Sequence, residues 1–430
     1  MMTPQNNRFF HNTHVRGQMR GVILAATLAL FLLSGVVWAF AEESLHSCDF
    51  NAANPAPDDV HGYELYTYTD SLRTDAAIQR IYRKLTARSP LTDLSVTVPA
   101  TRALSSAAPL DWGEIVTVTT PYTIYKADFV YAPSFLTTDM RYTDRESYEN
   151  HALTIFRGHD GHDFLRDRPV VFFVHGGGWV DGYRDWYEFV AESFTGVKGW
   201  VTVVIDYRLT SDQVFVADAY CPDRVTCGQP DSIAHRTKAA WYPDNIEDVA
   251  AALQWVVAHV GEHGGDPNKI VIFGHSAGAH LVSLLATHDD FAVDSRPHIR
   301  GVVSMSGAYD LNTLNRLFWT PIVSQTFVDG FSNTDLLAQA SPTTYLTPGL
   351  SLPSFYLLYC QLEAPSFADQ ALTFSDNLTG LGFNHDLSYL AGYSHVDEIA
   401  AIADIDATPT RLIVGWIEEL LANRVYLPLF

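Results

Sequence analysis

The chain has 430 residues, of which 47% are hydrophobic and 18% are charged, a balance typical of a packed globular protein and too apolar for a disordered one. Its 27 basic and 49 acidic side chains give a formal net charge of −22. Because a chain this acidic repels a polyanion, the charge argues against a phosphate-binding surface, and we expect no nucleic-acid partner.

The first 41 residues have the pattern of a targeting segment. Three arginines precede an apolar run over residues 21–41, and no acidic residue occurs before Glu42. Ala39 and Ala41 are the small residues of a candidate cleavage site, which predicts a signal peptide and an exported protein, secreted or periplasmic. The run is also long enough to cross a bilayer, so an uncleaved signal that tethers the protein to a membrane is the alternative.

Residues 42–111 are predicted to be a linker and an N-terminal extension. The stretch 51–59 is rich in asparagine, proline and aspartate, which is typical of a linker. No pattern between residues 42 and 111 points to a chemistry. We therefore expect the main domain over residues 112–430.

The four cysteines are too few for a disulfide scaffold in an exported chain. Cys221 and Cys227 enclose five residues, so a disulfide bond between them would close a short loop in an oxidising compartment. Cys360 ends an apolar run and is expected to be a buried thiol. The spacing of the four cysteines matches no zinc site.

A regular alternation of strands and helices begins near residue 112. Glu114–Thr120 and Thr123–Tyr131 have the alternating pattern of strands near a sheet edge. A helix is predicted from Asp244, with Glu247 completing a capping box, to a stop near residues 264–265. Nearly continuous apolar runs are typical of central parallel strands covered on both faces, and they occur at residues 170–174, 201–205, 270–273, 302–305 and 355–359. The pattern predicts an α/β fold with a doubly wound, mostly parallel sheet.

A serine stands in a Gly-x-Ser-x-Gly motif directly after the run at residues 270–273. The motif is Gly274-His-Ser-Ala-Gly278, and a helix-compatible segment follows it. A strand that turns so sharply into a helix needs the glycines, because a Cβ on either side would clash. The turn exposes the hydroxyl of Ser276 at the helix N-terminus, where developing negative charge is favoured. We therefore predict that Ser276 is a nucleophile.

A glycine-rich loop upstream of this motif is a candidate oxyanion hole. The loop is His175-Gly-Gly-Gly-Trp179, directly after another predicted strand. The backbone N–H groups of Gly177, Gly178 and Ala277 are predicted to converge on the carbonyl oxygen of a substrate. A glycine triplet alone would indicate a flexible loop, but its position ahead of the serine motif favours the oxyanion hole.

Together the two motifs resemble the α/β-hydrolase superfamily, in particular the branch of hormone-sensitive-lipase-like esterases, carbohydrate esterases and kynurenine formamidases. Asp-Tyr-Arg-Leu at 206–209 and Gly-Asp-Pro-Asn at 265–268 also fit that branch. His275 stands where strict hormone-sensitive-type lipases usually carry an acidic residue, so the chain is more similar to the formamidase and small-ester members. The resemblance covers about residues 112–425 and implies an α/β-hydrolase fold with small cap insertions.

The same resemblance implies the chain order serine, acid, histidine for a catalytic triad. His395 follows the last apolar stretch and is the predicted base, whereas the rival His385 precedes that stretch. Members of the family usually carry an aspartate after the preceding strand, but this chain has Glu363 there. Glutamate can serve because the role is to accept the imidazole N–H and stabilise the imidazolium. Glu363 is the predicted acid, and Asp369 is the alternative.

The loop His159-Asp-Gly-His-Asp163 contains metal-ligating residue types. Polar residues so closely spaced are more often solvated, and serine chemistry needs no metal. We therefore expect neither a metal ion nor a cofactor.

Substrate choice is expected to depend on the segments that cover the site, the insertion at 209–243 and the stretch at 311–345. Trp179, Phe318 and Trp319 are candidates for an apolar substrate pocket, although each could equally belong to the core.

The sequence thus predicts a serine hydrolase that cleaves a carboxylic ester of a small or medium substrate through an acyl-enzyme. One alternative is an aryl formamidase, which would cleave the C–N bond of an N-formyl aryl amide. The other is a non-catalytic binding protein on the same fold, although such relatives commonly lose the nucleophile or the base.

Overall fold

The computed structural model describes residues 64–65, 120–132, 151–180, 182–210 and 240–422, and its strands form one nine-stranded sheet in the order β1-β2-β3-β5-β4-β6-β7-β8-β9. At one edge, β1 (Glu64–Leu65), β2 (Thr123–Val130) and β3 (Ala152–His159) pair antiparallel, and β3 also pairs antiparallel with β5. The remaining strands run parallel to one another: β4 (Arg168–Val174), β5 (Val201–Ile205), β6 (Gly265–His275), β7 (Ile299–Met305), β8 (Ser354–Leu362) and β9 (His385–Ser394).

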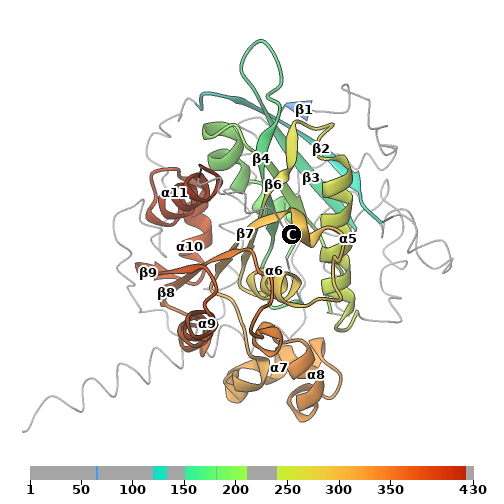
Figure 1. Ribbon diagram of the computed structural model, residues 1–430, viewed down its shortest axis with the longest axis vertical. Coiled ribbons are helices and arrows are strands. Elements are labelled where there is room, and N and C mark those ends of the chain that lie inside the picture. The colour runs from blue at the N-terminus through green and yellow to red at the C-terminus, as the bar shows by residue number, and fades with distance from the viewer. Residues whose placement is uncertain (1–63, 66–119, 133–150, 181, 211–239, 423–430) are drawn as a thin grey trace, which may run out of the picture.

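Both faces of this sheet are covered, which explains the continuous apolar runs in the sequence. On one face lie α5 (Asp244–His259), α6 (Ala277–Thr287) and α9 (Phe367–Leu381), whose buried side chains share one hydrophobic cluster. On the other face, α11 (Thr408–Ala422) and the short α10 (Asp397–Ala400) bury theirs in a second cluster. Figure 1 shows α5 and α11 on opposite sides of the strands. The predicted doubly wound α/β fold is confirmed.

The helix predicted from Asp244 is present as α5, but its predicted capping box is not. Pro243 occupies the N-cap position, and Asp244 is already the first helical residue. The Asp244 carboxylate instead accepts hydrogen bonds from the backbone N–H of Trp241 and from Arg208. The helix begins where predicted but ends at His259, ahead of the predicted stop near residues 264–265.

Strand β3 has no counterpart among the sequence predictions. Polar Thr154 and Arg157 interrupt its apolar pattern, yet both are buried. Thr154 is satisfied inside the fold, since its hydroxyl donates to the carboxylate of Asp128 at 2.6 Å and accepts from Arg184. A hydrophobic pattern cannot reveal a strand whose polar side chains are paired in the interior.

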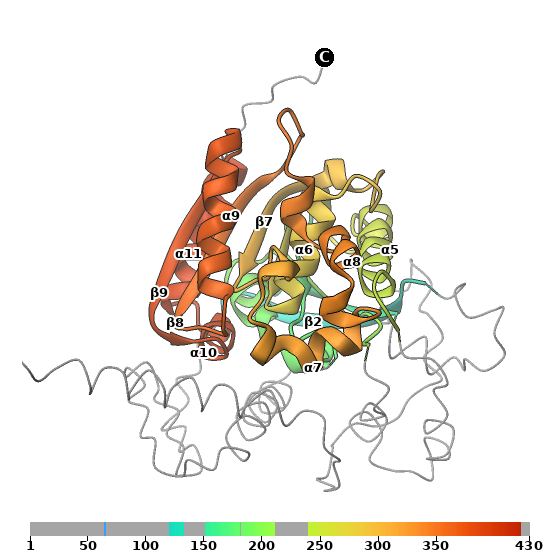
Figure 2. The ribbon, with the colours of Figure 1, turned by 90° about the horizontal axis from the view of Figure 1, so that it is seen from below.

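Between β7 and β8 the chain forms α7 (Arg316–Thr326) and α8 (Thr334–Gln339), which lie together at one end of the molecule (Figure 1). Both helices lie in the segment 311–345, one of the two segments predicted to cover the site. Of the other segment, 209–243, residues 211–239 lie outside the described residues. Seen from below, β8, β9 and their helices gather on one side and α5 lies on the other (Figure 2). Among the helices that the structure describes, none has the length and apolarity needed to span a bilayer.

The strand order places a switch point at β4, whose neighbours are β5, next in the chain, and β6. In open α/β sheets, ligands bind beyond the carboxyl ends of the strands at such a point. The predicted oxyanion loop follows β4 and the serine motif follows β6, so the topology brings the two motifs to the same edge.

Candidate active site

The polar residues of the candidate site each follow a parallel strand directly. Ser276 comes after β6, Ser306 after β7, Glu363 after β8 and His395 after β9. Because these strands are hydrogen-bonded neighbours in parallel register, their carboxyl ends lie side by side. The sheet therefore assembles one site from four widely separated positions in the chain.

The structure brings Ser276, His395 and Glu363 together as a hydrogen-bonded chain. The Nε2 atom of His395 lies 2.9 Å from Oγ of Ser276, and its Nδ1 atom lies 2.6 Å from Oε1 of Glu363. The carboxylate can only accept, so Nδ1 carries the proton and Nε2 is free to take the proton of the serine. This is the geometry of a nucleophile, a general base and an orienting acid.

The turn that carries Ser276 is strained and tightly packed. Ser276 has φ 56° and ψ −118°, a positive φ that costs energy for any residue other than glycine. Its backbone N–H donates to the carbonyl of Met305 at 2.9 Å, which fixes the turn to the end of β7. A Cβ on Gly278 would lie 2.0 Å from the carbonyl oxygen of Val174, and one on Gly274 would lie 2.3 Å from that of Gly278. The glycines of the motif are therefore required by close backbone approach.

The predicted oxyanion loop has a left-handed backbone beside this turn. Gly177 and Gly178 have φ values of 125° and 63°. A Cβ on the preceding Gly176 would lie 3.0 Å from the side chain of Ser276, so the loop passes close to the serine. Ala277 begins α6, and its N–H therefore has no partner within the helix. The arrangement is compatible with the predicted oxyanion hole, whose donor role remains a prediction.

Glu363 is held as a charged acceptor by several donors. Its Oε2 atom accepts from the hydroxyl of Ser306 at 2.5 Å and from the backbone N–H of Cys360 at 3.3 Å. Its Oε1 atom accepts from the backbone N–H of Ala364 at 2.8 Å. Burial alone would raise the pKa of Glu363, but the charge and hydrogen bond of His395, with Ser306 and Ala364, outweigh burial and lower it to about 2.

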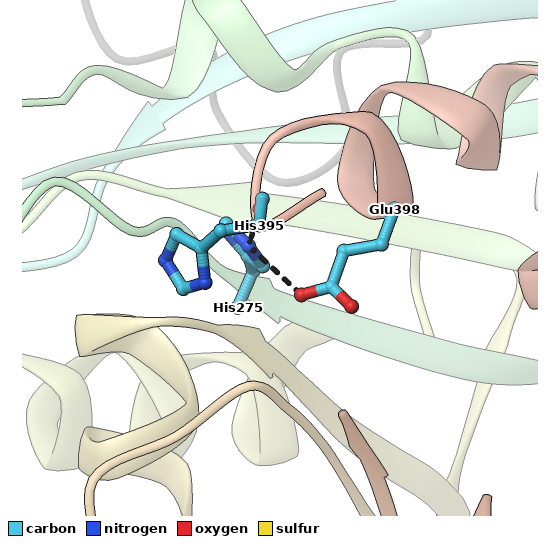
Figure 3. A group of neighbouring side chains, drawn as sticks. All are labelled: His275, His395 and Glu398. Atoms are coloured by element: carbon cyan, nitrogen blue, oxygen red, sulfur yellow. Dashed lines mark hydrogen bonds and ion pairs between the residues drawn. The ribbon is translucent and has the colours of Figure 1, made fainter. Parts of the chain in front are cut away.

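A second buried carboxyl group, that of Glu398, lies behind the triad and was missed by the sequence analysis. Its Oε1 atom is 3.5 Å from Nε2 of His275, and Figure 3 shows this contact beside His395. Glu398 lies on the first turn of α10, a position that typically holds exposed acids, and so gave no sequence signal. Ser306 was also missed, although its place directly after a strand could have identified it.

His275, His395 and Glu398 bring ligand atoms within 4.8 Å of one another, as do Cys360, Glu363 and Glu398. Such groups can hold a metal ion. In the first group, however, both ring nitrogens of His395 are already engaged by Ser276 and Glu363. In the second group, Oε2 of Glu363 already accepts from the hydroxyl of Ser306 and from the thiol of Cys360. We therefore assign these groups to the environment of the triad.

The alternative triad residues lie elsewhere. His385 opens β9, and its Nε2 atom lies 2.9 Å from the hydroxyl of Ser375 on α9. Asp369 lies on the first turn of α9 with its side chain exposed. Neither takes part in the chain of hydrogen bonds around Ser276.

The aromatic candidates for the substrate pocket, Trp179, Phe318 and Trp319, are almost completely buried, with at most 1% exposed. Trp319 stacks on Phe367 at a centroid distance of 4.8 Å, and Phe367 in turn contacts the ring of His395. The α7 helix is thus one aromatic ring away from the base. A lining role for the three residues stays a prediction.

The loop at 159–163 forms a solvent-exposed turn. The carboxylate of Asp160 accepts from the backbone N–H groups of His162 and Asp163, and these bonds lower the pKa of Asp160. Cys360 is a free, buried thiol, as predicted. Cys221 and Cys227 lie outside the described residues.

Known proteins share sequence with the part of the chain that carries the serine motif. Residues 231–359 match the family model described as BD-FAE, a stretch that includes the serine motif. LipM of Mycobacterium tuberculosis, described as a probable carboxylic ester hydrolase, is 30% identical over 50% of this chain and 46% of its own length. A probable isoprenylcysteine alpha-carbonyl methylesterase of Arabidopsis thaliana is 24% identical over 54% of this chain and 46% of its own length. The chain thus spans about half the length of these curated relatives.

Among solved structures, esterase B of Lactobacillus rhamnosis superposes with a TM-score of 0.51 at 16% identity, covering 82% of this chain and 96% of that one. At this identity the similarity establishes the fold alone. The chain therefore has the α/β-hydrolase fold and is similar in sequence to the carboxylic-ester hydrolases of that superfamily.

Proposed function

We propose that the protein is a serine esterase that hydrolyses carboxylic esters through an acyl-enzyme. The observation that carries this proposal is the ring of His395, held between Ser276 and Glu363 at 2.9 and 2.6 Å. The names of the curated relatives support the choice of an ester as substrate.

In the first half-reaction, Oγ of Ser276 attacks the ester carbonyl carbon while Nε2 of His395 takes its proton. The tetrahedral intermediate then collapses, the C–O bond to the alcohol breaks, and His395 returns the proton to the leaving alkoxide. In the second half-reaction, water attacks the acyl-enzyme with His395 again as base, which releases the acid and restores Ser276. Glu363 stabilises the imidazolium formed in both steps.

The negative charge on the carbonyl oxygen would be met by the N–H groups of Gly177, Gly178 and Ala277. Each such donor typically contributes about 3 kcal/mol to transition-state stabilisation. The α6 N-terminus adds a favourable dipole at the same place.

The substrate proposed is a small or medium ester, because the cap elements that the structure describes, α7 and α8, are short. We further propose that residues 1–41 direct export, by a signal that is either cleaved or retained as a membrane tether. This part of the proposal rests on the sequence alone.

Labelling with a fluorescent fluorophosphonate tests the proposal directly. The wild-type protein should take up one label per chain and release chromophore from short p-nitrophenyl esters. Ser276→Ala should abolish both, whereas Ser351→Ala, which alters an exposed serine, should change neither. Turnover of N-formylkynurenine in place of the esters would instead favour a formamidase, and an unlabelled wild-type protein would favour a non-catalytic one.

A further inference from the structure

Glu398 has an unusual environment for a carboxyl group. Its side chain is fully buried, and neither carboxyl oxygen has a hydrogen-bond partner among the described residues. A buried carboxylate without partners costs far more free energy than a buried carboxylic acid. Glu398 is therefore not explained as an exposed acid that stabilises the N-terminus of α10.

Titratable groups face Glu398 from every element packed around it. His275 comes from the end of β6 and Cys360 from β8, Glu363 directly follows β8, and His395 lies in the turn after β9. On α10 itself the neighbour is Asp397. Two carboxyl groups, Glu363 and Glu398, thus share one dry cluster, and two like charges so close cannot both be ionised at low cost.

The donors around the cluster decide which of the two keeps the negative charge. Glu363 receives the imidazole N–H of His395, the hydroxyl of Ser306 and two backbone N–H groups. Glu398 receives none at hydrogen-bond distance. In agreement, burial and then the charge of Glu363 raise the pKa of Glu398 well above its ordinary value, and the smaller opposing effects of the Ser306 hydroxyl and the Cys360 thiol do not offset this rise. One carboxyl group carries the charge and the other carries a proton, a division typical of paired acids in active sites.

We propose that Glu398 is a positioning residue of the triad, an uncharged carboxylic acid that closes the cluster behind Glu363. This inference rests on the function proposed for Ser276, His395 and Glu363. A second carboxylate at this place would compete for the protons of Ser306 and Cys360, which both face Oε2 of Glu363 at 2.5 and 3.4 Å. The protonated acid is a much weaker acceptor than the Glu363 carboxylate, so these donors stay directed at Glu363.

His275 connects the same acid to the backbone of the base. Its Nε2 atom donates to the carbonyl oxygen of His395 at 2.8 Å and lies 3.5 Å from Oε1 of Glu398. Since the carbonyl can only accept, Nε2 carries the ring proton. An uncharged Glu398 leaves that proton with the carbonyl of His395, and so helps to fix the turn that carries the catalytic ring.

The charge state can be tested by thermal unfolding, which needs no enzymatic activity. In the unfolded chain a glutamate loses its proton near pH 4.3, whereas folded Glu398 keeps it, so the contribution of Glu398 to the stability of the wild type should decrease as the pH rises above that value. Glu398→Gln takes up no proton on folding. The melting temperature of Glu398→Gln relative to wild type should therefore increase steadily from pH 5 to pH 8.

Glu419→Gln, which alters an exposed glutamate, is the matched control and should show a constant difference. A constant difference for Glu398→Gln as well would overturn the proposal. Should that variant not fold, the infrared carbonyl stretch of a protonated carboxylic acid in the wild type at pH 7 provides the same test. Its absence would overturn the proposal.

Ester turnover tests the positioning role. Glu398→Met keeps the side-chain volume but removes Oε1, the atom that lies 3.5 Å from Nε2 of His275, so the turn that carries His395 loses a polar neighbour. We expect kcat to fall about tenfold with KM unchanged. Glu398→Gln, which keeps an uncharged polar group at this place, should restore most of the loss. Equal kcat values for Glu398→Met and wild type would overturn the positioning role. If Ser276→Ala kept full activity, the proposed function would fail instead, so the two failures are distinguishable.

Discussion

The indole N–H of Trp179 lies 3.1 Å from Nδ1 of His280, and the other ring nitrogen of His280 lies 2.7 Å from the carbonyl oxygen of Ala340. The carbonyl can only accept, so Nε2 carries the proton and Nδ1 accepts from the indole. Trp179 directly follows the glycines of the predicted oxyanion loop, and His280 lies one turn after Ser276 on α6. One neutral histidine thus connects the predicted oxyanion loop to the helix that follows Ser276.

Replacing Trp179 by phenylalanine should destabilise the protein by about 1–3 kcal/mol, because Nδ1 of His280 would remain buried without a donor. Urea unfolding at neutral pH measures this loss. The control is Trp416→Phe, since the indole of Trp416 donates to Asp386 near the surface and its bond is replaceable by water. Equal losses in the two variants would mean that the buried bond contributes nothing specific.

Stability should fall in acid because of buried neutral histidines. Burial lowers the pKa of His175 and of His280 to about 4, whereas an unfolded histidine titrates near 6.5. Between these values the unfolded chain binds protons that the folded chain does not. The free energy of unfolding should therefore decrease as the pH falls from about 6.5 towards 4, by up to about 1.4 kcal/mol per pH unit for each group.

Denaturant titrations at a series of pH values between 7 and 5 provide the measurement. His280→Gln should reduce the slope of stability against pH, whereas His162→Gln, at an exposed position, should leave it unchanged. Because Glu398 is expected to change stability in the opposite sense over this range, the decisive quantity is the difference between variants, and an unchanged slope in His280→Gln would show that this ring is not held neutral.

Glu363→Gln should reduce kcat on the order of 10⁴-fold, because an amide neither fixes the required tautomer of His395 nor stabilises its charged form. Glu363→Asp keeps the charge on a shorter side chain and should lose less. Asp369→Asn, at the exposed alternative position, should be silent. Steady-state kinetics on a p-nitrophenyl ester distinguish these cases, and a Glu363→Gln variant within tenfold of wild type would exclude Glu363 as the orienting acid.

Gly278→Ala should destabilise the fold by at least about 3 kcal/mol, because a new Cβ would lie 2.0 Å from the backbone oxygen of Val174, which cannot move without displacing β4. Gly415 on α11 is the matched control, since nothing lies within 4 Å of a Cβ placed there. Gly415→Ala should instead stabilise the protein by about 0.4–1 kcal/mol. Melting temperatures of the two variants should therefore move in opposite directions.

The central strands could be predicted because their side chains are buried on both faces. Every residue of Val170–Val174 is fully buried, and the corresponding apolar run marks β4 without ambiguity. Strand β3 could not be predicted in this way, since its buried polar residues Thr154 and Arg157 give it the sequence pattern of an exposed segment. The capping box at Asp244 failed for a related reason, because its carboxylate finds partners in Trp241 and Arg208 that are not evident from local spacing.

The sequence led to Ser276, His395 and Glu363 through motif order and position after strands, and the structure brings these side chains within hydrogen-bond distance. Their catalytic roles stay predictions until they are tested. The burial of Glu398 could not be predicted from the sequence, because nothing in Val-Asp-Glu-Ile at 396–399 distinguishes a buried acid from an exposed one. Only the packing of α10 against the end of the sheet determines that difference.

The order in which the sheet is filled has a consequence for biosynthesis. The proposed nucleophile follows β6, but the proposed base follows β9, which among the described strands lies at the edge of the sheet and pairs with β8 alone. A nascent chain whose translation has not yet passed His395 contains Ser276 without the imidazole that is proposed to activate it. Under the proposed mechanism, ester hydrolysis therefore begins only after the chain has been synthesised beyond β9.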